Sequence, residues 1–199
     1  MPLGQHPISA YLFHAYPLSI LAQEDRYLPW FYSTYIQLFS FPDEELKFYT
    51  HPCCTHHQIR HLYVQTCPLL EARSIDRKTL APTPTGLGAW IRDAIEHKCY
   101  VQVDVDFFYL PNRQQHQRRH FIHEILVSGY EPVAQTFLCS GFDQRGQYTT
   151  AALPCAILEK ALAWTKERHI QQALDSGERL PPWFAAAMED RPSIFLYRY

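Results

Sequence analysis

Two runs rich in apolar residues, 100–110 and 121–130, dominate the hydrophobic pattern of the chain. Both contain many β-branched and aromatic residues, which suit a half-buried pleated surface, so they predict two strands that pair or lie close together. The residues between them, 111–120, are polar and cationic, and a protein core would accept them only with partners. We therefore predict that a surface loop joins the two strands.

Apolar residues at helical spacing predict helices over 87–97 and over 151–172, the second one beginning near Pro154. Another helix is expected to begin near Pro17, because the missing N–H of a proline costs nothing in the first turn. The run 30–39 satisfies both the helical and the strand period, and we interpret it as a helical start with an extended end. Further strands are predicted at 66–75, 136–142 and 193–199.

These elements together predict an α+β fold with helices packed on a mostly antiparallel sheet. A chain of 199 residues, 47% of them apolar, can bury one substantial core, so we expect a single domain over residues 1–199. The net charge of −2 gives no general attraction to nucleic acid or to an anionic membrane. No run reaches the roughly 18 to 20 apolar residues that span a bilayer, and the first residues lack a signal-peptide pattern. We expect a cytoplasmic protein.

The composition bears on partners and on redox state. Charged residues make up 19% of the chain and aromatic residues 15%, so either the surface uses many Tyr, His, Gln and Thr residues, or part of the aromatic surface is covered by a partner or by a second copy of the chain. The cysteines are spread along a chain of ordinary domain size, whereas disulfide scaffolds concentrate them in small secreted domains. We expect most of them to be reduced and buried: Cys53, Cys54, Cys67, Cys99, Cys139 and Cys155.

Candidate chemistry gathers at the ends of the two predicted strands. His123 stands at the start of the second strand, where a rigid backbone can direct its side chain into a cleft, or where the ring simply binds a backbone carbonyl. Asp106 ends the first strand and either orients another group or is satisfied by N–H groups of the loop. His120 is expected to be structural. The loop arginines, Arg113, Arg118 and Arg119, are interpreted as a solvated surface.

A second group of chemically active residues lies between His51 and His61. His57 and His61 are four residues apart and would share a helical face, so with Cys53 and Cys54 they could bind zinc. Two adjacent cysteines are not the C-x-x-C loop of structural zinc sites, however, and the chain has no second C-x-x-C. We therefore assign no metal and no cofactor, and keep a small zinc-binding protein as an alternative.

The sequence VDVDFFYLPN followed by HFIHEILVSGYE resembles the N-terminal papain-like domain of the butirosin-biosynthesis acyltransferase family, whose relatives are cysteine peptidases that process leader peptides. In that family an Asp before an aromatic pair and Leu-Pro closes one strand, and a loop leads to His-Phe-x-His, apolar residues and Gly-Tyr-Asp. The resemblance covers residues 87–146 well and the remainder loosely. The matching residues are Asp106, Phe107, Phe108, Tyr109, Leu110, Pro111, His120, Phe121, His123, Gly129 and Tyr130, with Glu131 in place of the Asp.

The resemblance implies a papain-like fold, with N-terminal helices on the sheet, and gives His123 the position of the catalytic histidine. The family's cysteine begins the first helix, but the corresponding residues 14–19 contain none. Ser19 lies in that region, yet a serine at a helix N-terminus is usually a cap. Cys54 is therefore the expected nucleophile, because Cys53-Cys54-Thr55 could open a helix.

The family's third catalytic member, an Asn or Asp, falls where this chain carries Cys139 and Ser140, with Asp143 close by in sequence. We predict that the catalytic residues are His123, Cys54 and Asp106. Family members usually continue beyond the last strand, so the domain is expected to lack a C-terminal extension or to be completed by a partner.

The resemblance implies acyl or peptidyl transfer, or hydrolysis, in the biosynthesis of peptide or polyketide antibiotics, including nonribosomal peptides. The substrate would be held by an acyl carrier protein. The loop arginines would then form the surface that binds this acidic protein or its phosphopantetheine phosphate. The alternative, which the missing early cysteine favours, is a non-catalytic accessory protein of the same fold that binds a carrier protein or an acyl ligand. No nucleic acid and no membrane is expected as a partner.

Overall fold

The computed structural model describes residues 1–8, 12–34, 37–39, 47–49, 67–80, 86–163, 171, 175 and 194–199. These residues fall into two compact units, Arg73–Arg198 together with Met1, and Pro2–Ala72 together with Tyr199. The single domain expected over residues 1–199 stays a prediction. The zinc alternative and the expected nucleophile lie outside the described residues: Cys53, Cys54, His57 and His61.

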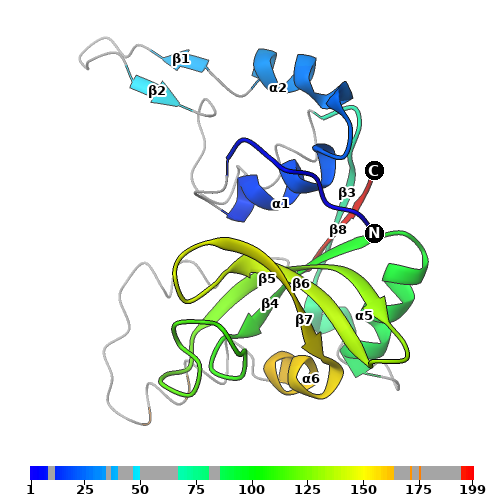
Figure 1. The fold of residues 1–199 in the computed structure, drawn as a ribbon, viewed down its shortest axis with the longest axis vertical. Coiled ribbons are helices and arrows are strands. Elements are labelled where there is room, and N and C mark those ends of the chain that lie inside the picture. Colours follow the sequence, from blue (N-terminus) through cyan, green and yellow to red (C-terminus); the bar gives the residue numbers. More distant parts are fainter. Residues whose placement is uncertain are drawn as a thin grey trace. The chain divides into compact units, whose positions relative to one another are not determined.

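The larger unit is built on a six-stranded sheet with the order β3-β8-β4-β5-β6-β7 (Figure 1). The pairings of β8 with β4, β4 with β5, β5 with β6, and β6 with β7 are all antiparallel. Together with the helices below, this sheet confirms the α+β class. The strands are β3 (Glu71–Ile75), β4 (Tyr100–Asp106), β5 (Ile122–Glu131), β6 (Thr136–Phe142), β7 (Tyr148–Pro154) and β8 (Ile194–Arg198).

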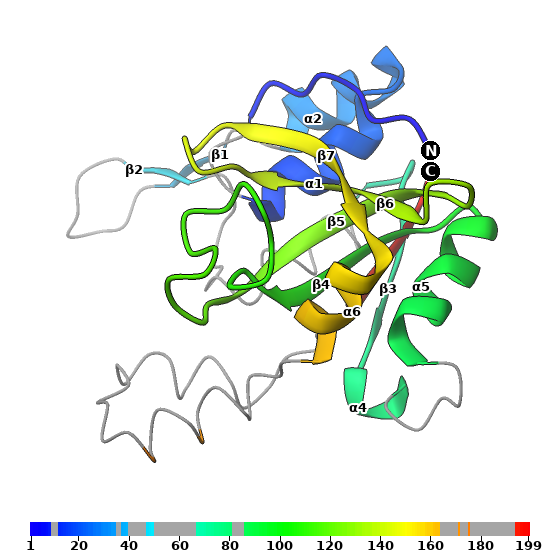
Figure 2. The ribbon, with the colours of Figure 1, turned by 60° about the horizontal axis from the view of Figure 1, so that its bottom comes forward.

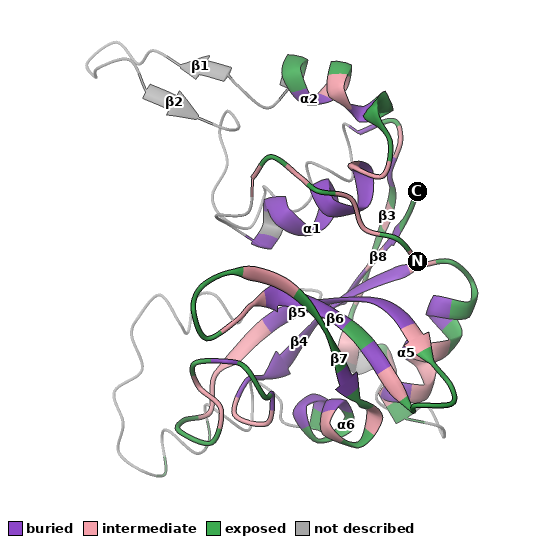
Figure 3. Ribbon diagram, in the orientation of Figure 1, coloured by how far each residue is buried: buried purple, intermediate pink, exposed green. Residues whose placement is uncertain are grey.

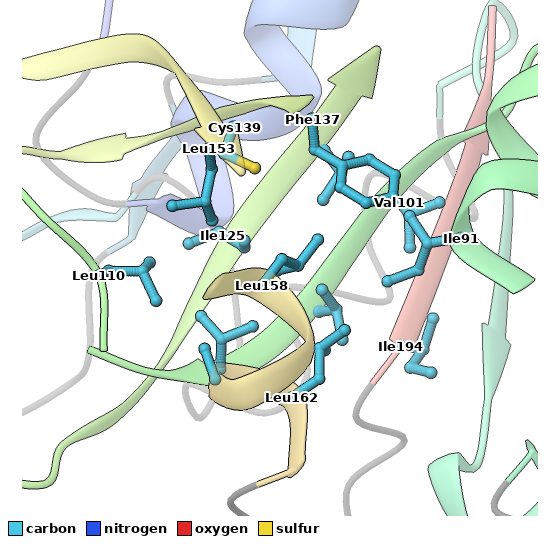
Figure 4. Close-up of a cluster of buried hydrophobic side chains, with 14 of the residues drawn as sticks. Ile91, Val101, Leu110, Ile125, Phe137, Cys139, Leu153, Leu158, Leu162 and Ile194 are labelled. Carbon is cyan, nitrogen blue, oxygen red and sulfur yellow. The ribbon is translucent and has the colours of Figure 1, made fainter. Parts of the chain in front are cut away.

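Two helices, α5 (Gly86–Glu96) and α6 (Cys155–Ala163), cover the apolar face of this sheet (Figure 1). Their inward residues form one buried cluster with Val101, Val103 and Val105 of β4 (Figure 4). Ile91 of α5 and Leu158 of α6 are completely buried there. A short helix, α4 (Arg77–Leu80), follows β3.

The helix start expected near Pro154 is confirmed, although the predicted span 151–172 also included residues that belong to β7. Residues 151–154 continue β7, because Tyr148-Thr149-Thr150 favours a strand and the whole segment pairs with β6. The helix begins only at Cys155, directly after Pro154. The run 100–110 is also shorter as a strand than predicted, since β4 ends at Asp106 and the chain turns immediately afterwards.

The opposite face of β4 is polar and equally buried (Figure 3). Gln102 lies at the centre of a hydrogen-bonded chain: its Nε2 donates to Glu124 Oε2 at 2.5 Å, and its Oε1 accepts from the Tyr197 hydroxyl at 2.7 Å. Asp104 lies directly across from Glu124 in the β4–β5 register. The burial of Gln102, Glu124 and Tyr197 is tolerated because these side chains are hydrogen-bonded to one another.

The smaller unit contains α1 (Leu12–Leu21), a 3-10 turn η1 (Asp25–Tyr27), α2 (Leu28–Thr34) and an antiparallel strand pair, β1 (Gln37–Phe39) and β2 (Lys47–Tyr49). The helical start and extended end expected for 30–39 are confirmed. The helix start expected near Pro17 is wrong, because Pro17 lies inside α1. Burial of the apolar residues before it offsets the hydrogen bond that proline removes.

Among the described residues, no helix combines the length and the apolar character needed to cross a membrane.

Candidate functional site

Asp106, the last residue of β4, is completely buried and uses both carboxylate oxygens. Oδ1 accepts the backbone N–H groups of Phe108 and Phe121, each at 3.0 Å. Oδ2 lies 2.5 Å from Nδ1 of His120. The carboxylate therefore joins the two ends of the loop 107–121 and holds an imidazole ring at the same time.

The ring of His120 is fixed from two directions. The Asp106 carboxylate binds Nδ1, and the ring of Phe108 stacks on the imidazole with centroids 4.4 Å apart and planes 24° from parallel. The side chain remains 21% exposed. Since Nδ1 is bound to the carboxylate, proton transfer to or from a third group runs through Nε2, as in catalytic histidines that a carboxylate orients.

The loop that carries His120 is anchored along its length (Figure 2). The buried guanidinium of Arg113 donates to the carbonyl of Phe142 and lies 5.4 Å from the centroid of the Phe107 ring. Gln117 N donates to the carbonyl of Phe108 at 3.0 Å, with Gln117 itself at a φ of 52°. A non-glycine residue in that region is held there by its surroundings.

The loop arginines differ in their exposure. Arg113 is buried and is not part of a solvated surface, and its guanidinium binds within the fold. Arg118 and Arg119 are exposed, as expected, and the Arg119 guanidinium lies 5.7 Å from the Phe121 ring centroid. An acidic partner could therefore meet Arg118 and Arg119 but not Arg113.

His123 lies on the other face of β5 from His120 and has different neighbours. Its Nδ1 accepts the N–H of Glu124 at 2.9 Å, and its ring lies between Phe107 and Phe121, with centroids at 5.4 Å and 5.5 Å. Within the part of the chain that the structure describes, its ring has no carboxylate partner. The structure thus brings Asp106 together with His120 and not with His123.

Sequence reasoning treated His120 as structural, although a signal for this pair was available. Asp106 is in register with Ile122 across the β4–β5 ladder, and side chains of an extended chain alternate between faces. Counting back two residues from Ile122 places His120 on the face of Asp106. The position of His123 at the start of the second strand, and then the resemblance, led to the choice of His123 instead.

The hydroxyl and thiol candidates that the structure describes are not activated. Ser19 is buried inside α1, where its hydroxyl donates to the carbonyl of Tyr16 at 2.9 Å, so it is neither a cap nor a nucleophile. Burial raises the pKa of Cys139 to about 12 and also raises the pKa values of Cys67 and Cys155. A reactive cysteine needs the opposite shift.

The residues expected in the third catalytic position also have local roles. The Ser140 hydroxyl shares a hydrogen bond of 2.7 Å with the Thr150 hydroxyl. The Asp143 carboxylate accepts the N–H groups of Gln147 at 2.9 Å and Arg145 at 2.8 Å, and these bonds, Gln147 first, lower its pKa. Asp143 therefore stabilises its own turn.

Within the described ranges, no group of three or more His, Cys, Asp or Glu side chains is arranged to hold a metal ion. Comparison with protein-family models and with curated proteins finds no match for this chain. The site is therefore interpreted from its own geometry.

Proposed function

We propose that this chain is a papain-like, cysteine-dependent enzyme that transfers or hydrolyses acyl or peptidyl groups in peptide or polyketide antibiotic biosynthesis in the cytoplasm. The observation that carries the proposal is the 2.5 Å contact between Asp106 Oδ2 and His120 Nδ1. A buried carboxylate that binds one imidazole nitrogen orients the ring so that the other nitrogen can act as a general base, which is the arrangement that nucleophilic acyl transfer uses. The proposal assigns the base to His120 in preference to His123.

In the proposed reaction His120 Nε2 accepts the proton of a thiol, and Asp106 stabilises the resulting imidazolium. Cys54 stays the nucleophile predicted from the sequence. The sulfur attacks the acyl carbonyl, a C–S bond forms, and the bond to the leaving thiol or amine breaks as that group takes the proton from His120. An amine or water then attacks the acyl-enzyme and regenerates the thiol. A carrier protein that holds the acyl group as a thioester is the proposed substrate.

The reactivity of the thiols tests the assignment of the base without knowledge of the substrate, and peptide mapping identifies the cysteine that reacts. We expect iodoacetamide to label the nucleophilic cysteine at pH 7 faster than the others, and His120→Ala to slow that labelling by about 10- to 100-fold. His123→Ala is the matched control, since it removes a ring three residues away, and it should leave the rate within about twofold. Equal effects of the two substitutions would remove His120 from the role of base.

A second candidate function is a non-catalytic accessory protein of the same fold that binds a carrier protein or an acyl ligand. It is favoured by one observation: Asp106 closes the loop 107–121 through two backbone N–H groups, which is a structural use of the carboxylate. In that case every cysteine reacts no faster than an ordinary thiol, and His120→Ala leaves the rates unchanged. Zinc, the third alternative, would appear in an elemental analysis of the purified protein at about one ion per chain.

A further inference from the structure

The strand β7 forms one edge of the six-stranded sheet, and its composition is unusual for an edge. Its sequence, YTTAALP, contains no charged residue, and Thr150, Ala151, Ala152 and Pro154 are exposed. An edge strand presents unpaired N–H and C=O groups to any other strand, so proteins usually protect edges with charged residues, prolines, bulges or a covering segment. Of these features, β7 has only a proline, Pro154, at its end.

The opposite edge of the same sheet shows the usual protection. β3 has the sequence EARSI and exposes the charged side chains of Glu71 and Arg73. A strand that approached β3 would have to desolvate these charges, whereas a strand that approached β7 would meet none. Another strand can therefore pair with the β7 edge of the sheet more readily than with the β3 edge.

We propose that β7 pairs with the β7 strand of a second copy of this chain, antiparallel and about a two-fold axis at Ala151. In this register Thr150 faces Ala152 and Tyr148 faces Pro154, so small side chains meet small ones along the middle of the strand. No like charges face each other, and the flanking turn with Asp143 and Arg145 adds no net charge. A copy also matches the edge in length, and such isologous contacts are the commonest in homo-oligomers.

An apolar patch beside the edge extends the surface that pairing would cover. Leu138 of β6 is 39% exposed and lies in register with Ala152 of β7, on the same face of the sheet. The low fraction of charged residues, 19% of the chain, agrees with part of the surface being covered in this way. Pairing two such edges would join two six-stranded sheets into one.

The mass of the full chain in solution tests the proposal first. Sedimentation velocity or light scattering should give a dimer for the natural sequence. Ala151→Lys places two ammonium groups opposite each other at the axis and should give a monomer with an unchanged circular dichroism spectrum, because the side chain is exposed. Val133→Lys, at an exposed residue outside β7, is the control and should remain a dimer.

A cross-link tests the register independently of any loss of folding. Directly opposed residues of antiparallel strands have Cα atoms about 4.5 to 5.5 Å apart, within reach of a disulfide. Ala151→Cys should therefore form a disulfide between position 151 of the two chains, identified by peptide mapping, and Thr149→Cys should not link to itself. A monomeric natural chain, or a dimer that neither Ala151→Lys nor Ala151→Cys affects, would overturn the proposal.

Discussion

The two faces of β4 are equally buried but are stabilised in different ways. On one face Val101, Val103 and Val105 pack against α5 and α6, where contact and loss of water supply the free energy. On the other face Gln102 and Asp106 depend on particular hydrogen bonds. The apolar face tolerates substitutions that change the shape of a side chain but not those that introduce a charge. The polar face is sensitive to the loss of a single hydrogen-bond partner. The candidate chemistry lies on the polar face.

The largest expected effect comes from placing a charge on the apolar face. Val103→Asp would bury a carboxylate among aliphatic side chains, at a cost of more than about 4 kcal/mol in the free energy of unfolding. We expect no cooperative thermal transition by circular dichroism. Val103→Ala is the control and should remain folded, destabilised by about 2 kcal/mol. A cooperative transition of Val103→Asp close to that of the natural chain would contradict the assignment of this face.

Removing the carboxylate at the end of the polar face should cost somewhat less. Asp106→Ala leaves the N–H groups of Phe108 and Phe121 without their acceptor and is expected to lower the free energy of unfolding by about 3 kcal/mol. Asp106→Asn retains one oxygen for these groups and should cost about half as much. Urea unfolding measures both values. Equal costs for the two substitutions would show that the loop does not depend on Oδ1.

A single hydroxyl on the same face gives a smaller and sharper test. Tyr197→Phe removes the donor to Gln102 Oε1 and should cost about 1 kcal/mol. In a double-mutant cycle with Gln102→Leu, the two losses should not add, because both substitutions remove the same hydrogen bond. Strict additivity would contradict the hydrogen-bonded chain from Tyr197 to Glu124.

The smallest effect concerns reactivity and needs no change in stability. Cys139 belongs to the apolar cluster, and burial raises its pKa to about 12, so it holds almost no thiolate at pH 8. We expect iodoacetamide to leave Cys139 unlabelled in the folded protein and to label it in urea. Half-buried Cys99 is the comparison and should react in the folded state. Rapid labelling of folded Cys139 would contradict its place in the core.

The alternation of residue types in β4 shows which features of the fold the sequence predicts. The pattern YVQVDVD predicts the strand and assigns its residues to two faces, and the antiparallel pair with β5 confirms that prediction. It does not predict that the polar face is buried, because the hydrogen bonds that make burial tolerable come from β5 and β8. The local pattern around Pro17 failed for a related reason, since the packing of its buried neighbours outweighed the local preference of proline, whereas α6 does begin directly after Pro154.

The candidate site was predictable in part. Asp106 and the loop that follows it were found from the polar run and from the resemblance. Which histidine the carboxylate binds depends on the path of the loop, and that path is set by the contacts of Arg113 and Gln117, which no spacing rule contains. Cys54 stays a prediction.

The stacking of Phe108 on His120 also makes the site visible to spectroscopy. A phenyl ring 4.4 Å from an imidazole places the imidazole protons in its ring current, which shifts their NMR resonances from the values of an exposed histidine. Because the same ring is bound to Asp106, those displaced resonances would follow changes in the carboxylate, in the loop and in any molecule that approaches Nε2. The protein thus supplies its own probe for screening substrates one by one.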